Sequence, residues 1–284
     1  MELYVGLDIG GTKCMAASSD ADGRILKKIL KPTPFLLQEG LDLLHQMVDE
    51  VAGGEKIAGI GAAIGGPLDW KNGIVSPLHQ PEWRNVPLKA IMEKKWKSPF
   101  SVDVDTNIAA FGEYLLGGET ARHFLYITIS TGVGAGYIID GKIYRGMDGG
   151  HPEAGHQSIN YRCSNPSGIS CECGAPDCLE ALVSGNGIRR IYNKAPEALS
   201  AEEWEEVTFN IAQGLRNLAT VCLPEVIVLG GGVALGRGEK LVNEVRMIVG
   251  KNLHLVPCPA IHLSHLKYDT ALMGALLAAR VGIE

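Results

Sequence analysis

The sequence predicts an α/β protein of two domains, and three observations predict it. The chain has 284 residues, more than one hydrophobic core usually organises. A pattern of strand, glycine-rich turn, strand, Asp-Gly turn and strand occurs twice along it. Segments with helical periodicity follow each copy of the pattern. We therefore expect two similar domains that face each other across a cleft, each with one glycine-rich turn.

The first copy of the pattern opens the chain. A strand-like run at 3–7 leads into the turn DIGGTK at 8–13, and strand-like runs follow at 14–18 and 24–30. In such a turn the glycines let backbone amides approach phosphate oxygens, and a carboxylate placed like Asp8 can hold Mg²⁺ through water. A plain glycine hairpin is the alternative explanation of this turn when it is taken alone.

The second copy repeats this order much later in the chain. A strand-like run at 124–129 leads into STGVG at 130–134, and runs at 137–139 and 142–145 flank an Asp-Gly turn. The two glycine-rich turns occupy matching places in a repeat. Phosphate binding therefore explains them better than two unrelated hairpins do.

Helical periodicity fills the remaining space. We expect helices at 36–51, 88–96, 108–116, 202–222 and 269–281. The repeat places a smaller domain at 1–115 plus 268–284 and a larger one at 116–267, which carries a long loop at 151–180. In the larger domain a buried strand at 226–229 precedes Gly230-Gly231-Gly232, where the backbone can approach a nucleotide or form a simple tight turn.

Asp105 follows the run VDV at 102–104 and stands where a helix is expected to begin. A carboxylate at that junction can act as general base for a hydroxyl that attacks a γ-phosphoryl group. A helix N-cap is the alternative role for Asp105. Asp103 is expected to be its exposed partner on the same strand. Trp83 could stack on a sugar face or pack in the core.

The long loop offers three thiols and one imidazole, which suffice to bind structural Zn²⁺ in tetrahedral geometry. They belong to Cys171, Cys173, Cys178 and His156. The Cys-x-Cys-x₄-Cys spacing and the odd number of seven cysteines favour metal binding in a reducing cytoplasm over disulfides. One ring nitrogen of His156 could bind zinc while the other binds a ligand hydroxyl.

Two carboxylates, Glu153 and Glu180, flank this set, and a metal would hold them ready to accept hydrogen bonds from a polar ligand. His151, at the start of the same loop, is expected to be an ordinary loop residue.

Charge and hydropathy exclude other classes of protein. The net charge of −6 argues against nucleic acid or an anionic membrane as the main partner. No apolar run approaches the ~18–20 residues of a membrane span, and we expect no secretory signal.

With these motifs in order, the chain resembles the ROK family (repressors, open reading frames and sugar kinases) from end to end. DIGGTK resembles the first phosphate turn of the family, and the segment 132–156 follows its central signature. The segment 171–180 resembles the Cys-x-Cys-Gly-x-x-Gly-Cys-x-Glu zinc motif, and GGGV at 230–233 resembles the loop on the adenosine side.

The resemblance implies an actin-like (ribonuclease H-like) two-domain sugar-kinase fold and ATP-dependent phosphorylation of a hexose, glucose foremost, at its 6-hydroxyl. It implies ATP, Mg²⁺ and structural Zn²⁺ as cofactors and a cytoplasmic homodimer or homotetramer, with Asp105 as the general base. The implied binding residues are Gly66, Asp105, Glu153, His156 and Glu180 for the sugar, Asp8, Gly10, Gly11, Thr12, Lys13, Thr131, Gly132, Gly231 and Gly232 for ATP and its phosphates, and Asp8 for Mg²⁺.

Departures from the family pattern leave the sugar open. Val104 replaces the Asn that normally binds sugar hydroxyls, so polar recognition at that hydroxyl is lost. Fructokinases of the family share a non-Asn residue there and a His-Pro-Glu-x-Gly-His motif, although their zinc motif normally has His at the place of Cys173. Fructose, mannose and amino sugars remain alternatives to glucose, as does polyphosphate to ATP. A sugar-binding regulator without catalysis is the alternative from another class of protein.

Overall fold

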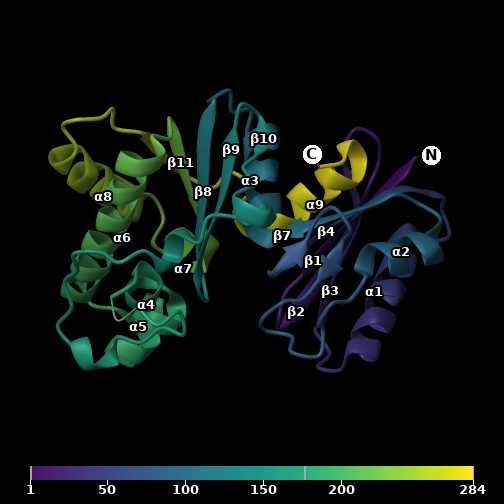
Figure 1. Ribbon diagram of the computed structural model, residues 1–284, viewed down its shortest axis with the longest axis horizontal. Coiled ribbons are helices and arrows are strands. Elements are labelled where there is room, and N and C mark those ends of the chain that lie inside the picture. The colour runs from purple at the N-terminus through teal and green to yellow at the C-terminus, as the bar shows by residue number, and fades with distance from the viewer. Residues whose placement is uncertain (1, 176, 284) are drawn as a thin grey trace. The chain divides into compact units, whose positions relative to one another are not determined.

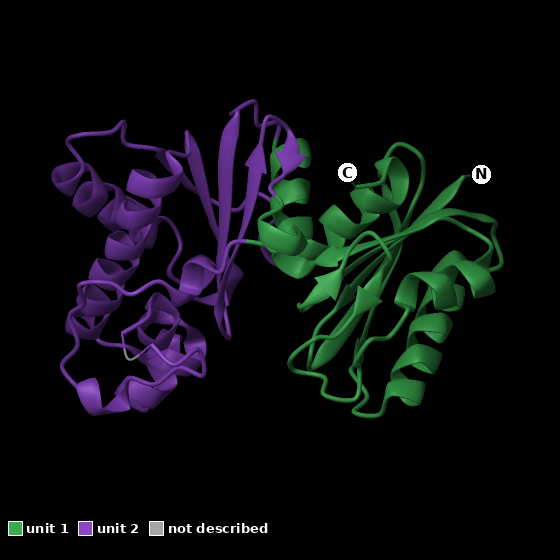
Figure 2. Cartoon of the chain, viewed as in Figure 1, with its two compact units in different colours: residues 1–117, 145–151, 269–284 green, residues 118–144, 152–268 purple. Residues whose placement is uncertain are grey.

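The structure is a computed structural model that describes residues 2–175 and 177–283. Contacts divide the chain into two compact units (Figure 2). Unit 1 comprises residues 1–117, 145–151 and 269–284, and unit 2 comprises 118–144 and 152–268. Each unit is built on a five-stranded mixed sheet with helices packed against it (Figure 1).

Unit 1 has the strand order β3-β2-β1-β4-β7. The first three strands form antiparallel pairs, and β4 and β7 continue the sheet in parallel with β1. The elements are β1 (Leu3–Ile9), β2 (Lys13–Ser19), β3 (Ile25–Pro32), α1 (Leu37–Ala52), β4 (Ile57–Ile64), β5 (Leu68–Asp69), β6 (Ile74–Val75), α2 (Leu88–Trp96), β7 (Phe100–Val104), α3 (Asp105–Leu116) and α9 (Thr270–Val281).

The two faces of this sheet pack on different helices. Alternate residues of a strand point to opposite faces, so Val5 and Leu7 of β1 join the core under α1 and α2, while Gly6 faces α9. Helix α1 buries one apolar stripe and is capped by Gly53, which has a left-handed φ of 59° and donates its N–H to the Asp49 carbonyl.

The opposite face of the sheet is covered by α9, which approaches the backbone of β4 closely. A methyl group at Gly61 would overlap the Ala275 carbonyl oxygen, and one at Gly274 would overlap the Ile108 carbonyl oxygen of α3. Glycine is required at both places because a side chain at Gly61 would push α9 away from β4, and one at Gly274 would push α9 away from α3.

Unit 2 repeats this plan, with the strand order β10-β9-β8-β11-β12. The three antiparallel strands β10-β9-β8 correspond to β3-β2-β1, as the sequence repeat predicted. The elements are β8 (His123–Ile129), β9 (Val133–Ile139), β10 (Lys142–Ile143), α4 (Leu179–Val183), α5 (Gly185–Tyr192), α6 (Ala201–Cys222), β11 (Val226–Gly230), α7 (Gly231–Arg237), α8 (Glu239–Asn252) and β12 (Ala260–Leu263).

The long helix α6 carries the core of unit 2. A capping box between Ser200 and Glu203 starts this helix, and its buried face includes Ile211 and Leu215. Strand β10 ends at Ile143, so the expected strand at 142–145 is too long: Arg145 leaves the sheet and packs with unit 1. Among the described residues, no helix is both long and apolar enough to cross a membrane.

Candidate active site

The first glycine-rich turn joins β1 to β2 in unit 1. It closes with a hydrogen bond from the Gly10 amide to the Lys13 carbonyl at 3.1 Å, and Gly11, Thr12 and Lys13 are exposed. Thr33, just after β3, holds the turn from the side. Its amide donates to the Thr12 carbonyl at 3.0 Å and its hydroxyl donates to the Gly10 carbonyl at 2.7 Å. The result is an exposed and anchored loop, as a phosphate-binding turn requires.

Asp8 and Asp105 carry the charge near this turn. Asp8 belongs to β1, and Asp105 opens α3 directly after β7. Burial raises the pKa of the Asp8 carboxyl to about 7, with a smaller contribution from the Asp105 carboxylate, and Lys13 opposes both effects. A divalent cation would offset burial and repulsion together, so the residues present fit Mg²⁺.

The junction between β7 and α3 is fixed by side chains that bind its backbone. The Asp105 carboxylate accepts from the Thr106 amide at 2.7 Å, and Asp105 is itself the first helical residue, so the N-cap position belongs to Val104. The Asp103 carboxylate accepts from the Val104 amide at 2.7 Å and from Asn107 Nδ2 at 3.2 Å.

Asp103 is buried, which corrects the expectation that it is exposed. Its side chain is 1% exposed and pairs with Arg145 through a contact of 2.6 Å between Oδ2 and Nη1. The Arg145 guanidinium in turn lies over the Trp70 ring, 3.9 Å from its centroid. A carboxylate can stay inside a protein when it is paired in this way. No sequence motif signalled Arg145, because its partner is distant along the chain.

Gly66 lies beside this junction. A methyl group at Gly66 would be 3.5 Å from Cγ2 of Val104 and 3.5 Å from Cε1 of His151, so both side chains face the same side of its backbone. His151 lies in a loop, as expected, and its ring reaches Gly66. Trp83 does not contribute to a ligand surface: it is 1% exposed and packs in the core of unit 1, against Gly40.

The second glycine-rich turn joins β8 to β9 in unit 2. The Ser130 amide donates to the Gly132 carbonyl at 2.8 Å, which closes the turn. Glu180 Oε2 accepts from the Val133 amide at 2.8 Å, and a methyl group at Gly132 would lie 2.6 Å from that oxygen. The turn is therefore shaped by the carboxylate that follows the cysteine motif.

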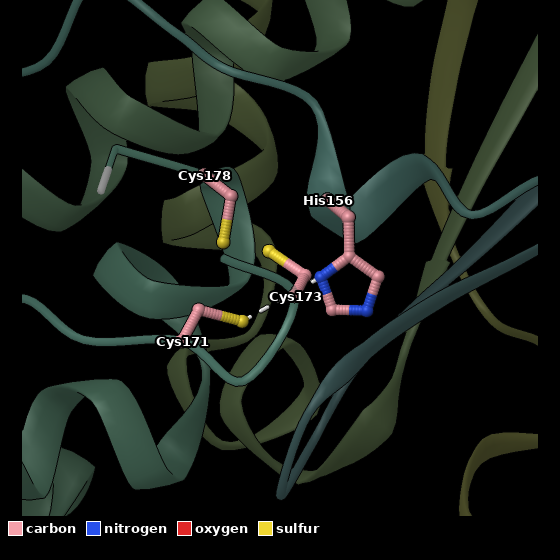
Figure 3. Close-up of side chains that lie close together, drawn as sticks. All are labelled: His156, Cys171, Cys173 and Cys178. Atoms are coloured by element: carbon pink, nitrogen blue, oxygen red, sulfur yellow. Dashed lines mark hydrogen bonds between the residues drawn. The ribbon is translucent and has the colours of Figure 1, made fainter. Parts of the chain in front are cut away.

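The four residues proposed from the sequence as zinc ligands come together in unit 2. The donor atoms of His156, Cys171, Cys173 and Cys178 all lie within 4.8 Å of one another, and Figure 3 shows their side chains pointing toward one region. Sulfur atoms on one tetrahedral zinc would lie about 3.8 Å apart, given Zn–S bonds of about 2.3 Å. The donor set and its spacing fit Zn²⁺.

The two nitrogens of the His156 ring face different neighbours. Nδ1 lies 3.6 Å from Cys171 Sγ, whereas Nε2 lies 3.8 Å from Glu153 Oε2. Both side chains are partly exposed, at 32% for His156 and 59% for Glu153. Metal binding through Nδ1 would leave Nε2 on the side of Glu153, as the double role suggested for His156 requires.

The third glycine run lies at the end of β11. Gly231 has a left-handed φ of 84°. Its backbone lies so close to Ile129 that a methyl group on Gly231 would overlap the Ile129 carbonyl oxygen. Gly232 has open space where a side chain would be. Helix α7 begins at Gly231, so the run forms the turn between strand and helix.

The arrangement in each unit agrees with one known family. The model of the ROK family matches residues 4–281. The chain belongs to the ROK family. Among its ROK relatives, a glucokinase from Streptomyces coelicolor is 28% identical over 319 residues, 99% of this chain and 98% of that protein. A fructokinase from Streptococcus mutans is 30% identical, over 86% of this chain and 84% of its own.

Solved structures of the family show the same fold. The ROK family glucokinase from Streptomyces griseus, in complex with glucose and AMPPNP, matches with a TM-score of 0.82 and 28% identity. The match covers 98% of this chain and 99% of that one. The α/β sugar-kinase fold class predicted from the sequence is thereby confirmed.

Proposed function

We propose that this ROK protein is an ATP-dependent hexose kinase, which transfers the γ-phosphoryl group of ATP to the primary hydroxyl of a hexose. The observation that carries the proposal is that the carboxylates of Asp8 and Asp105 lie near each other beside an exposed glycine-rich turn. Asp8 suits the binding of a cation, and Asp105 suits the acceptance of a proton. The glucokinase with glucose and AMPPNP among its relatives supports the same reaction.

Asp105 is the general base in this proposal. It accepts the proton of the sugar hydroxyl while that oxygen bonds to the γ-phosphorus and the bond from the γ-phosphorus to the bridging oxygen of ADP breaks. Its hydrogen bond with the Thr106 amide holds the carboxylate at the start of α3. Asp8 supports Mg²⁺, which when bound neutralises phosphate charge.

The remaining groups bind substrates. Two turns bind phosphates through backbone amides: one contains Gly10, Gly11, Thr12 and Lys13, and the other contains Thr131 and Gly132. The backbone at Gly231 and Gly232 approaches the nucleotide. Gly66, Glu153, His156 and Glu180 bind the sugar. Structural Zn²⁺ would be held by His156, Cys171, Cys173 and Cys178. It would supply no step of the reaction and would keep the carboxylates of Glu153 and Glu180 in place.

Glucose is the first sugar that we propose, because glucokinases are among the relatives over almost the full chain. Fructose is the second candidate, favoured by the fructokinase relative and by the His-Pro-Glu-x-Gly-His motif. Mannose and amino sugars follow. We propose a homodimer or homotetramer in the cytoplasm, where reduced thiols are available for zinc.

The test is an ADP-release assay with Mg-ATP and a panel of hexoses and amino sugars. Asp105→Asn should lower turnover by about 10²–10⁴-fold and keep sugar binding. The control is Asp22→Asn, an exposed carboxylate in the turn after β2, which should turn over as the wild type does. A parallel assay with polyphosphate tests the other donor.

The same assay decides between the kinase and a sugar-binding regulator. Sugar binding by the wild type without turnover on either donor would favour the regulator. Turnover that survives in Asp105→Asn would remove Asp105 from the role of base.

A further inference from the structure

The segment Arg145–His151 is a strap that leaves unit 2 after β10 and packs with unit 1 before the chain returns at Pro152. The strap is a compact loop in which the Gly146 amide donates to the Gly150 carbonyl at 2.8 Å. Figure 2 shows it in the colour of unit 1. A loop that crosses to the other unit in this way must be held there by specific contacts.

Contacts with Asp103 and Trp70 hold the strap. Arg145 forms the buried ion pair with Asp103 and stacks on Trp70, with 15% of its side chain exposed. Gly149 also lies on Trp70, because a methyl group there would be 3.1 Å from the Cδ1 atom of its ring. The loss of either partner of a buried ion pair strands the other charge, so the pair fixes the strap strongly.

The same carboxylate fixes the residue before Asp105. Asp103 accepts a hydrogen bond from the Val104 amide and also forms the ion pair with the Arg145 guanidinium. The position of the strap and the position of Val104 are therefore set by one side chain. His151 stands at the far end of the strap.

The strap delivers an imidazole to the place where Val104 offers only methyl groups. Of the atoms nearest to an added methyl group at Gly66, one is Cε1 of His151 and two are the Cγ atoms of Val104. Cε1 is bonded to both ring nitrogens, so a donor or acceptor nitrogen lies one bond away from that point. The side chain of Val104 can make no hydrogen bond.

We infer that His151 is a sugar-binding, specificity-determining residue, which makes the hydroxyl contact that Val104 cannot make. The inference rests on the proposed sugar kinase and on the approach of the sugar to Gly66. The ligand group is an unsubstituted hexose hydroxyl, because imidazole exchanges one hydrogen bond with a hydroxyl as donor or acceptor. Arg145 and Asp103 are positioning residues, which act through the strap.

The test compares the wild type with His151→Ala, Val104→Asn and the double variant on the best sugar of the panel. His151→Ala should raise the KM for the sugar about tenfold, with a smaller change in kcat, because a hydrogen bond to a neutral ligand is lost. The KM for ATP should stay unchanged. Val104→Asn in the His151→Ala background should restore most of the sugar affinity, since its amide can replace the imidazole.

Deoxy analogues of the same sugar separate recognition from folding. In the wild type, removal of the hydroxyl that His151 binds should cost about tenfold in kcat/KM, and in His151→Ala that cost should disappear at this one position. A purely structural role would weaken all analogues equally. His151→Phe keeps a ring and removes both nitrogens, so it gives the same readout if the alanine variant does not fold.

His254→Ala, an exposed histidine between α8 and β12, is the control for the loss of an imidazole. An unchanged sugar KM in both His151 variants, or equal loss with every deoxy analogue, would overturn the inference. Failure of the wild type to phosphorylate any sugar would instead refute the proposed function. Sugar binding measured by calorimetry without ATP would then still test His151.

Discussion

The Glu180 carboxylate accepts a hydrogen bond from the Val133 amide at 2.8 Å, and its other oxygen lies 3.7 Å from Cys171 Sγ. One side chain therefore connects the second glycine-rich turn to the cysteine cluster within unit 2. Because Glu180 also follows Cys178 by only two residues, we expect a change in the cluster to alter the turn that we propose for phosphate binding.

Glu180→Ala should loosen that turn. The Val133 amide would lose its partner, which costs about 1–3 kcal/mol and should raise the KM for ATP by about five- to a hundredfold. Glu172→Ala, in the same loop but exposed, is the matched control and should leave the KM for ATP unchanged. Equal KM values for both variants would disprove the link between the carboxylate and the turn.

Removal of zinc should abolish sugar binding before it unfolds the protein. None of the described residues at 170–178 belongs to the apolar core of unit 2, to which α6 contributes Ile211 and Leu215, so a chelator should disorder this segment first. Calorimetric sugar binding and far-UV circular dichroism would follow the two events separately. Cys178→Ser should behave like the chelated protein, and Cys258→Ser, at an exposed thiol, should not. Unchanged sugar affinity in zinc-free protein would contradict the prediction.

The pKa of Asp8 gives stability a defined pH dependence. A pKa of about 7 means that the folded chain keeps this proton where the unfolded chain, with a pKa near 4, has released it. The folded state therefore binds more protons between about pH 4 and 7, so stability falls as pH rises through that window. Asp8→Asn should be more stable than the wild type at pH 8, by about 1–3 kcal/mol, and nearly equal to it at pH 4.

Urea unfolding at several pH values, with and without Mg²⁺, would measure this difference. Mg²⁺ should stabilise the wild type at pH 8 and have little effect on Asp8→Asn. Asp140→Asn is a control for which the pH dependence of stability should have the opposite sign, because a hydrogen bond from Arg122 lowers the pKa of Asp140. A constant difference between Asp8→Asn and wild type from pH 4 to 8 would show that Asp8 does not carry the shifted proton.

The buried pair of Arg145 and Asp103 should show strong coupling in a double-mutant cycle. Arg145→Met alone should cost about 3–5 kcal/mol in the free energy of unfolding, because it leaves the Asp103 carboxylate buried and unpaired. Arg145→Met combined with Asp103→Leu should recover part of that loss. Arg24→Met, at an exposed arginine, is the control for the loss of charge. Additive losses in the double variant would mean that the pair is not coupled.

Local patterns predicted much of the fold. The predicted helix at 88–96 coincides with α2, and the one at 202–222 differs from α6 by one residue, because both are amphipathic and α6 has a capping signal. The four cysteine and histidine donors were predicted from spacing alone, since ligands on one loop must be close in sequence as well as in space.

Features set by tertiary contacts escaped the sequence analysis. Strand β4 was not predicted, because Gly59 and Gly61 lower its strand propensity and are needed only where α9 approaches. The burial of Asp103 was missed for a related reason: its partner Arg145 lies on a strap whose return to unit 1 no local pattern encodes. The place of His151 beside Gly66 depends on the same strap. The expected strand at 142–145 would have kept Arg145 in the sheet of unit 2, whereas the structure places it with unit 1.

The contact of α9 with β4 also orders events in time when the protein is made. A ribosome delivers residues 269–284 only after all of unit 2 has been synthesised. Until then the face of the first sheet that Gly61 shares with α9 stays open to water and to chaperones. All residues of unit 2 are therefore synthesised before the last part of unit 1, although unit 1 begins the chain. A fragment that stops after residue 268 has every residue of unit 2 but lacks the helix that covers this face of the first sheet.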